Sequence, residues 1–108
     1  MATGILGTPA DLTATTNTTL YTVPAGTFTI ASVSLCNRSA SSVTVRIALS
    51  ANASPTNAEW IEYGATIPAY GVLERSGLAL DTGRNIVVYA SAGSAVSAVA
   101  YGIETSTS

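Results

Sequence analysis

The chain has 108 residues, which is enough for one domain with a core of its own and too few for two. Charged residues make up only 9% of the sequence, against about 25% in ordinary soluble domains, and the net charge is −2. The four arginines are spread along the chain, so they form no basic cluster for nucleic acid, and no apolar run approaches the ~20 residues of a membrane-spanning helix.

The low charge, combined with a hydrophobic fraction of 47%, predicts that part of the surface meets other protein. The alternative is a monomer coated in serine and threonine hydroxyls. The first residues have neither the basic start nor the apolar run of a signal peptide, so we expect synthesis in a cytoplasm without export. The single cysteine, Cys36, excludes an internal disulfide and is expected to be a small buried hydrophobe.

The first segment, residues 1–12, is expected to be an N-terminal arm, because Ile5 and Leu6 have no obvious partners in it. Such an arm adds a strand to the sheet of a neighbour, packs on its own domain or is disordered. The remainder divides into a β-sandwich domain over residues 13–104 and a polar tail over residues 105–108.

Two strands are predicted at residues 18–23 and 27–37, joined by a turn with Pro24 and Gly26. The second strand is irregular, because Phe28 and Ile30 share one face whereas Val33 and Leu35 share the other. This change of phase predicts a bulge near residues 31–32, or a strand buried on both sides.

The clearest strand covers residues 42–50, where Val43, Val45, Ile47 and Leu49 alternate with smaller or polar side chains. Period two is typical of a strand with one buried face. The residues before it, Asn37 to Ser41, have the composition of a turn.

The second half of the chain predicts four further strands, separated by a loop and by turns that contain Pro68, Gly83 and Gly93, with a bulge at Gly77. These strands cover residues 59–63, 72–80, 86–91 and 95–104. No segment has helical periodicity. The sequence therefore predicts an all-β fold, a single β-sandwich or jelly-roll-like domain of about seven or eight short antiparallel strands.

Little in the sequence indicates that the chain is a catalyst. With no histidine and one cysteine, the chain lacks the usual triads, dyads and zinc sites, and we expect no enzyme activity, cofactor or metal. Glu59 and Glu62 flank Trp60, but residues three apart on a strand point to opposite faces and would not share a glycosidase site.

The triplet Asp81-Thr82-Gly83 matches the active-site triplet of aspartic proteases, in which two aspartates share a proton across a dimer axis. Only 25 residues follow Gly83, whereas that family has most of its fold after the triplet. A hairpin turn, for which Asp and Gly supply the angles, is the favoured interpretation.

The aromatic residues Trp60, Tyr63 and Tyr70 lie around the central loop. We expect them to belong to the core; the alternative is that they anchor an interface or stack on sugars. Together with Ile5 and Leu6 they are the candidate assembly contacts.

Residues 18–104, about four fifths of the chain, resemble small β-rich proteins encoded among the virion genes of bacteriophages. The segments that carry the resemblance are LYTVPAG, CNR, VTVRIAL, WIEY, IPAYGVLE and LDTGRNIVVYAS.

The resemblance implies a structural protein at the surface of a phage particle, made in the host cytoplasm, with the major capsid protein or a tail protein as partner. A short chain without a fibre-like repeat best fits a capsid decoration or cement protein, which commonly forms homotrimers over capsid-subunit junctions. The alternatives are a tail or baseplate subunit, and a carbohydrate- or receptor-binding module that uses Trp60 and Tyr70.

Overall fold

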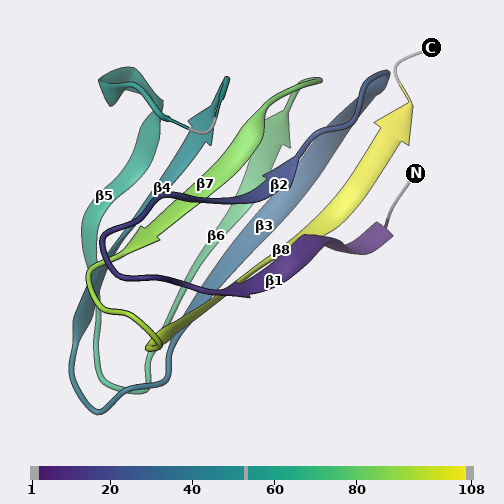
Figure 1. Ribbon diagram of the computed structural model, residues 1–108. Coiled ribbons are helices and arrows are strands. Elements are labelled where there is room, and N and C mark those ends of the chain that lie inside the picture. Colours follow the sequence, from purple (N-terminus) through teal and green to yellow (C-terminus); the bar gives the residue numbers. More distant parts are fainter. Residues whose placement is uncertain (1–2, 53, 107–108) are drawn as a thin grey trace.

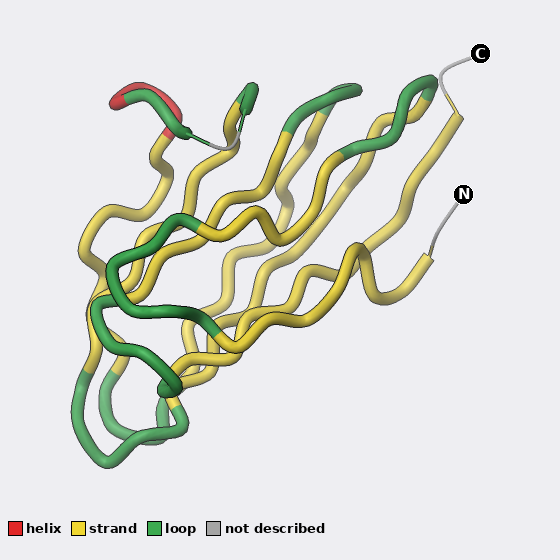
Figure 2. Tube along the Cα trace, viewed as in Figure 1, coloured by secondary structure: helices red, strands yellow, loops and turns green. Residues whose placement is uncertain are grey.

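The computed structural model describes residues 3–52 and 54–106 and contains eight strands and a single 3₁₀ turn (Figures 1 and 2). The elements are β1 Thr3–Asp11, β2 Thr18–Thr22, β3 Thr27–Asn37, β4 Val43–Ser50, η1 Asn57–Glu59, β5 Trp60–Ile67, β6 Val72–Leu80, β7 Asn85–Ala90 and β8 Val96–Ser106. In these ranges no helix is long and apolar enough to cross a membrane.

The strands form two antiparallel sheets, ordered β1-β8-β3-β6 and β2-β7-β4-β5 (Figure 1). Each strand of the first half pairs with one of the second half in reverse order: β1 with β8, β2 with β7, β3 with β6 and β4 with β5. This nesting is the strand order of a long hairpin folded over into two layers, which is the jelly roll. The predicted all-β sandwich is therefore confirmed.

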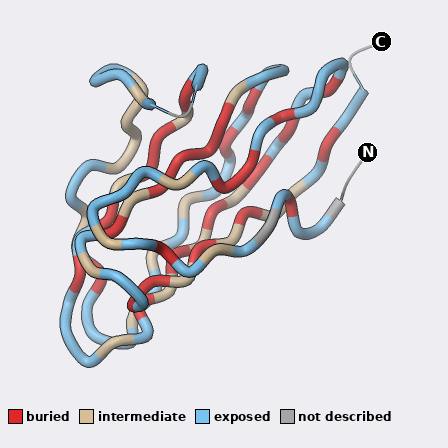
Figure 3. Tube along the Cα trace, in the orientation of Figure 1, coloured by how far each residue is buried: buried red, intermediate tan, exposed pale blue. Residues whose placement is uncertain are grey.

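The core lies between the two sheets and is built from alternate residues of facing strands. Val33 and Leu35 of β3 face Val45 and Ile47 of β4, and all four are fully buried. Figure 3 shows the alternation of buried and exposed positions along the strands. Because each strand places every second side chain in this layer, the period-two pattern of residues 42–50 correctly predicted β4.

The bulge predicted near residues 31–32 is present in the pairing of β3 with β6, where the register shifts between Ala31 and Val33, but β3 itself is regular. Burial alternates regularly along the whole of β3, and its register with β8 is unbroken. The extra residue lies on the partner strand β6, where Gly77 has a φ of +71°, as the sequence predicted for that position. Phe28 and Ile30 break the sequence pattern because they are apolar residues on the outer face of the sheet.

The N-terminal segment is not a separate arm. Residues 3–11 form β1, which pairs with β8, and the side chains of Leu6 and Leu12 lie in the core. At the other end, β8 continues to Ser106 by pairing with Thr27, so residues 105–106 belong to the sheet. Residues 1–2 of the predicted arm and 107–108 of the predicted tail lie outside the described residues.

The predicted turns are confirmed by their hydrogen bonds. Thr27 N donates to Pro24 O at 3.3 Å, Gly71 N to Pro68 O at 2.9 Å, and Arg84 N to Asp81 O at 3.1 Å. One end of the sandwich is fixed further by Asn37, which is fully buried. Its side-chain amide donates to the carbonyls of Ser41, Ile67 and Pro68 at 2.8–3.2 Å, so it ties the β3–β4 loop to the β5–β6 turn.

The edge strands β5 and β6, on the side of the sandwich away from β1 and β2, are joined by an ion pair. Arg75 of β6 lies 2.5 Å from Glu62 of β5, so a charge pair links the two sheets where the apolar layer ends.

Candidate binding surfaces

The outer face of the β2-β7-β4-β5 sheet carries a row of three side chains at matched register. Arg46 of β4 lies between Tyr63 of β5 and Tyr89 of β7. Its guanidinium carbon is 4.2 Å from the centroid of the Tyr63 ring and 4.3 Å from that of Tyr89, with Trp60 at 6.0 Å. These distances are those of cation–π contacts, which hold the guanidinium in place.

An irregularity in the edge strand β5 brings Trp60 and Tyr63 to the same side. Residues three apart on a regular strand point to opposite faces. Here the register with β4 shifts between Ile47 and Ala48, so that Ile61 is an extra residue, and Trp60 pairs with Ala48 while Tyr63 pairs with Arg46. The rings of Trp60 and Tyr63 consequently meet edge to face, with centroids 5.6 Å apart.

A surface pocket of about 420 Å³ is lined by Asn57, Trp60 and Tyr63. The side chain of Asn57 comes from the 3₁₀ turn that precedes β5, so the loop and the strand each contribute. A volume of this size lies within the range of small-molecule sites, which combine aromatic walls with a few polar groups. We call Arg46, Asn57, Trp60, Tyr63 and Tyr89 the aromatic site.

Among the described residues, Arg46 differs from the other arginines in having no acidic partner. Arg38 pairs with Asp11, Arg75 with Glu62, and Arg84 with Glu59 and Asp81. Within the part of the chain that the structure describes, the Arg46 side chain makes no hydrogen bond or ion pair; its guanidinium contacts aromatic rings. Because a guanidinium has five N–H donors, Arg46 retains the capacity to bind an anion.

The outer face of the other sheet, β1-β8-β3-β6, is apolar near the described chain ends. Ile30 pairs directly with Ile103, and Ile5 of β1 pairs with Tyr101, two residues from Ile103 on the same side of β8. With Phe28, two residues from Ile30 on the same side, these residues form a surface whose members are 39–55% exposed. We call Ile5, Phe28, Ile30 and Ile103 the apolar face.

Charged groups on this outer side already have hydrogen-bond or ion-pair partners. Glu74 of β6 accepts a hydrogen bond from the Tyr101 hydroxyl, and Asp11 pairs with Arg38 at the far end of the sheet. Cys36 is on the same outer side and is half-buried, so the expectation that it belongs to the core is wrong.

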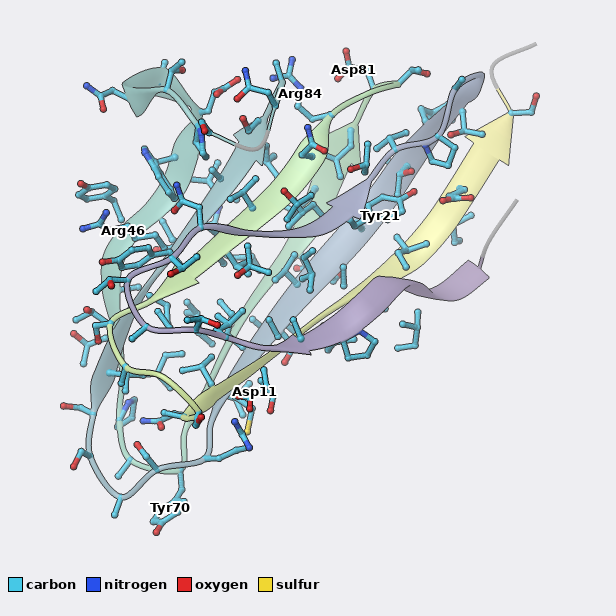
Figure 4. The ribbon with its side chains drawn as sticks, viewed as in Figure 1. Asp11, Tyr21, Arg46, Tyr70, Asp81 and Arg84 are labelled. Carbon is cyan, nitrogen blue, oxygen red and sulfur yellow. The ribbon has the colours of Figure 1, made fainter. Side chains whose placement is uncertain are left out.

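The candidate contacts divide into accessible and inaccessible residues. Ile5 is 55% exposed, whereas its neighbour Leu6 is buried in the core and cannot contact a partner. Tyr63 and Tyr70 are 65% and 70% exposed, so the expectation that they are core residues is wrong. Tyr70 lies in the β5–β6 turn, away from Arg46 (Figure 4), and does not join Trp60 and Tyr63 in one cluster.

The sequence could not predict the contribution of Arg46, Asn57 and Tyr89 to the aromatic site. The pattern of residues 42–50 did place Arg46 on the outer face of its strand, which was the available signal. Tyr89 and Asn57 come from distant segments, and their proximity depends on strand order.

The acidic residues have structural partners in place of a shared catalytic site. The Asp81 side chain is 79% exposed in the β6–β7 turn, where it meets Arg84 at 3.4 Å. Glu62 faces Arg75, whereas Glu59 binds Ser50 Oγ and the amides of Ala51 and Thr56. Across residues 3–52 and 54–106 no group of three or more potential ligands is arranged to hold a metal ion.

Tyr21 and Glu59 have shifted pKa values. The amides of Thr56 and Ala51 donate to the Glu59 carboxylate and lower its pKa below the ordinary 4.5. Burial, and next the hydrogen bond to Glu104, raise the pKa of Tyr21 to about 12. Both groups thus hold the protonation state that supports the local hydrogen bonds at neutral pH.

The fold and its surfaces define an all-β jelly-roll domain with an apolar outer face on one sheet and an aromatic pocket on the other. Comparison with protein-family models, with curated proteins and with solved structures finds no match, and the class therefore rests on the strand topology of the chain itself.

Proposed function

We propose that this chain is a structural protein of a bacteriophage particle, a capsid cement protein that binds the head shell and bridges neighbouring capsid subunits. The observation that carries the proposal is the apolar face, which exposes Ile5, Phe28, Ile30 and Ile103 on the same side of the three neighbouring strands β1, β8 and β3. Contiguous apolar surface on a small soluble domain marks a site of contact with other protein.

The apolar area of this face and the state of its charged groups both favour binding to another protein. Covering a half-exposed isoleucine removes apolar surface from water at about 25 cal/mol per Å², and four neighbouring side chains act together. Glu74 on this outer side accepts a hydrogen bond from Tyr101, and Asp11, which pairs with Arg38, lies at the far end of the sheet, so covering the apolar face leaves neither carboxylate without a partner.

The rigidity of the sandwich also supports the proposal. Phe28, Ile30 and Ile103 of the apolar face lie on β3 and β8, and β3 pairs with β8 without interruption from Thr27 to Asn37. A surface that is ordered before binding loses little conformational entropy when it docks. A protein that reinforces a shell benefits from this property.

The partner we propose is the major capsid protein, with a homotrimer of this chain at the capsid-subunit junctions. The resemblance of residues 18–104 to phage virion proteins supports this partner, and the low charge of the chain supports assembly. A tail or baseplate subunit is the alternative, since the same face would serve there.

The test is co-sedimentation of the purified chain with phage heads that lack it, and separately with tails. The double substitution Ile30→Ser with Ile103→Ser removes the centre of the apolar face, and we expect it to abolish binding to heads. Tyr70→Ser, at a 70% exposed position in the β5–β6 turn, is the control and should bind as the unaltered chain does.

Binding to tails but not to heads would replace the cement role by the tail alternative. A freely soluble monomer with affinity for neither would overturn the proposal. Mass determination in solution, by light scattering after gel filtration, tests the trimer.

A further inference from the structure

We propose that the aromatic site binds an acidic saccharide, with the carboxylate of a sugar acid on Arg46 and a sugar ring against Trp60 and Tyr63. The site lies on the opposite sheet from the apolar face, so it is independent of the cement proposal. Both sites could be occupied in the same particle.

The charge of the site favours an anionic ligand. Arg46 is held between two tyrosine rings and, among the described residues, has no acidic partner. The guanidinium carbon lies 4.2 and 4.3 Å from the two ring centroids, and among the described residues no hydrogen bond occupies the side-chain N–H donors of Arg46. A planar guanidinium binds a carboxylate through two parallel hydrogen bonds, and the ring contacts hold the group while leaving its donors available.

The shape of the site favours a sugar ring. Trp60 and Tyr63 meet edge to face and line a pocket of about 420 Å³ with Asn57. A pyranose has an apolar C–H face that packs on an aromatic ring, and its hydroxyls bond to an amide such as that of Asn57. A mixture of aromatic surface and few orienting polar groups is typical of small-ligand sites.

Buried residues beneath the aromatic site indicate that the site is already formed before a ligand binds. Ala48 and Val87 lie on the same outer side of the sheet, at register positions next to Trp60, and both are fully buried although they are outside the inter-sheet core. Side chains on this outer face therefore cover both residues and form a packed second layer. A ligand would meet a preformed surface, which lowers the entropic cost of binding.

The experiment uses the intrinsic fluorescence of the full chain, because Trp60 is its only tryptophan and lines the pocket. The chain is titrated with 3′-sialyllactose and with a glucuronate-containing oligosaccharide, and in parallel with lactose as a neutral counterpart. We expect saturable changes in the Trp60 emission with the acidic sugars and about tenfold weaker binding of lactose.

Two variants keep Trp60 as the fluorescent reporter and separate the contribution of Arg46 to sugar binding from that of Tyr63. Arg46→Gln should reduce the preference for acidic over neutral sugars to about one and remove the salt dependence of binding. Tyr63→Ala, at a side chain that is 65% exposed and outside the core, should weaken both classes of sugar. Tyr70→Ala is the matched control for a lost exposed tyrosine and should bind unchanged.

Circular dichroism of each variant establishes that the sandwich is retained. If neither acidic sugar alters the emission at millimolar concentration, the inference is overturned. Equal binding of acidic and neutral sugars, unaffected by Arg46→Gln, would overturn the role assigned to Arg46.

Discussion

The hydroxyl of Tyr21 on β2 donates a hydrogen bond to the carboxylate of Glu104 on β8 and so joins the two sheets inside the sandwich. The same hydroxyl lies 2.9 Å from Thr29 Oγ1 on β3, and all three residues are buried. A polar link of this kind aligns the layers in a way that apolar packing alone does not.

This link predicts a loss of stability at alkaline pH. The pKa of Tyr21 is about 12 in the folded chain and 10.0 ordinarily, so the unfolded state releases the proton first. The contribution is therefore complete below pH 10.0 and is lost as the pH rises to about 12. Urea unfolding across this range should show a fall of about 2 kcal/mol in the free energy of unfolding that Tyr21→Phe abolishes.

The control for this experiment is Tyr70→Phe. Tyr70 is exposed, so its removal should leave the alkaline fall in place. An unchanged fall in Tyr21→Phe would contradict the assignment to the buried hydroxyl.

Asn37→Ala should destabilise the fold by about 2–3 kcal/mol, because three carbonyls lose the donor that joins the β3–β4 loop to the β5–β6 turn. Chemical denaturation measures the effect. Asn17→Ala, at an exposed position before β2, should change the free energy of unfolding by no more than about 0.5 kcal/mol. Equal effects of the two substitutions would show that the Asn37 network contributes nothing.

Glu59→Gln should loosen the loop between β4 and β5. The carboxylate accepts hydrogen bonds from the amides of Thr56 and Ala51 at 2.9 and 3.0 Å, and a neutral amide group accepts them less strongly. Hydrogen exchange of these two amides should become faster in the variant, while exchange in β3 stays slow.

The pH dependence has a defined sign. The folded pKa of Glu59 is below the ordinary 4.5, so its contribution is present above pH 4.5 and is lost as the pH falls through the lower, folded value. Protection of the Ala51 and Thr56 amides should fall in acid in the unaltered chain. If Glu59→Gln shows the same acid response, another group is responsible.

Gly102→Ala should be among the most damaging single substitutions in β8. Gly102 has a φ of +153°, and a Cβ there would lie 2.1 Å from the carbonyl oxygen of Ile30 on the neighbouring strand. We expect a loss of at least about 3 kcal/mol in the free energy of unfolding. Gly26→Ala, with a φ of +74° and no atom within 4 Å, should cost only about 1–2 kcal/mol.

A comparable cost at the two glycines would mean that β3 and β8 separate enough to admit the extra atom. Amide exchange at Ile103 in Gly102→Ala would report such a separation.

What the sequence predicted well was local. The alternation from Val43 to Leu49 and the turns at Pro24, Pro68 and Gly83 depend on residues close in the chain, and these elements are correctly predicted. The N-terminal strand was missed because Gly4, Gly7 and Pro9 interrupt any alternation. β1 is a strand because β8, from the other end of the chain, supplies its hydrogen bonds.

The candidate surfaces were harder to predict for the same reason. Nothing in the spacing of Trp60 and Tyr63 indicates that the extra residue Ile61 returns them to one side of β5. Ile30 and Ile103 are 73 positions apart and become neighbours only through the pairing of β3 with β8. Ile5 alone, among the residues of the apolar face, was a candidate contact from the sequence.

The position of β8 between β1 and β3 determines the order of events during folding. Neither of those two strands has its shared neighbour until residues 96–106 have been synthesised, so the first sheet cannot close while translation of this segment is incomplete. Contacts between such remote segments are slow to form. Nascent chains should therefore remain accessible to chaperones and proteases until late, and removal of the last strand should abolish the fold and not merely shorten it.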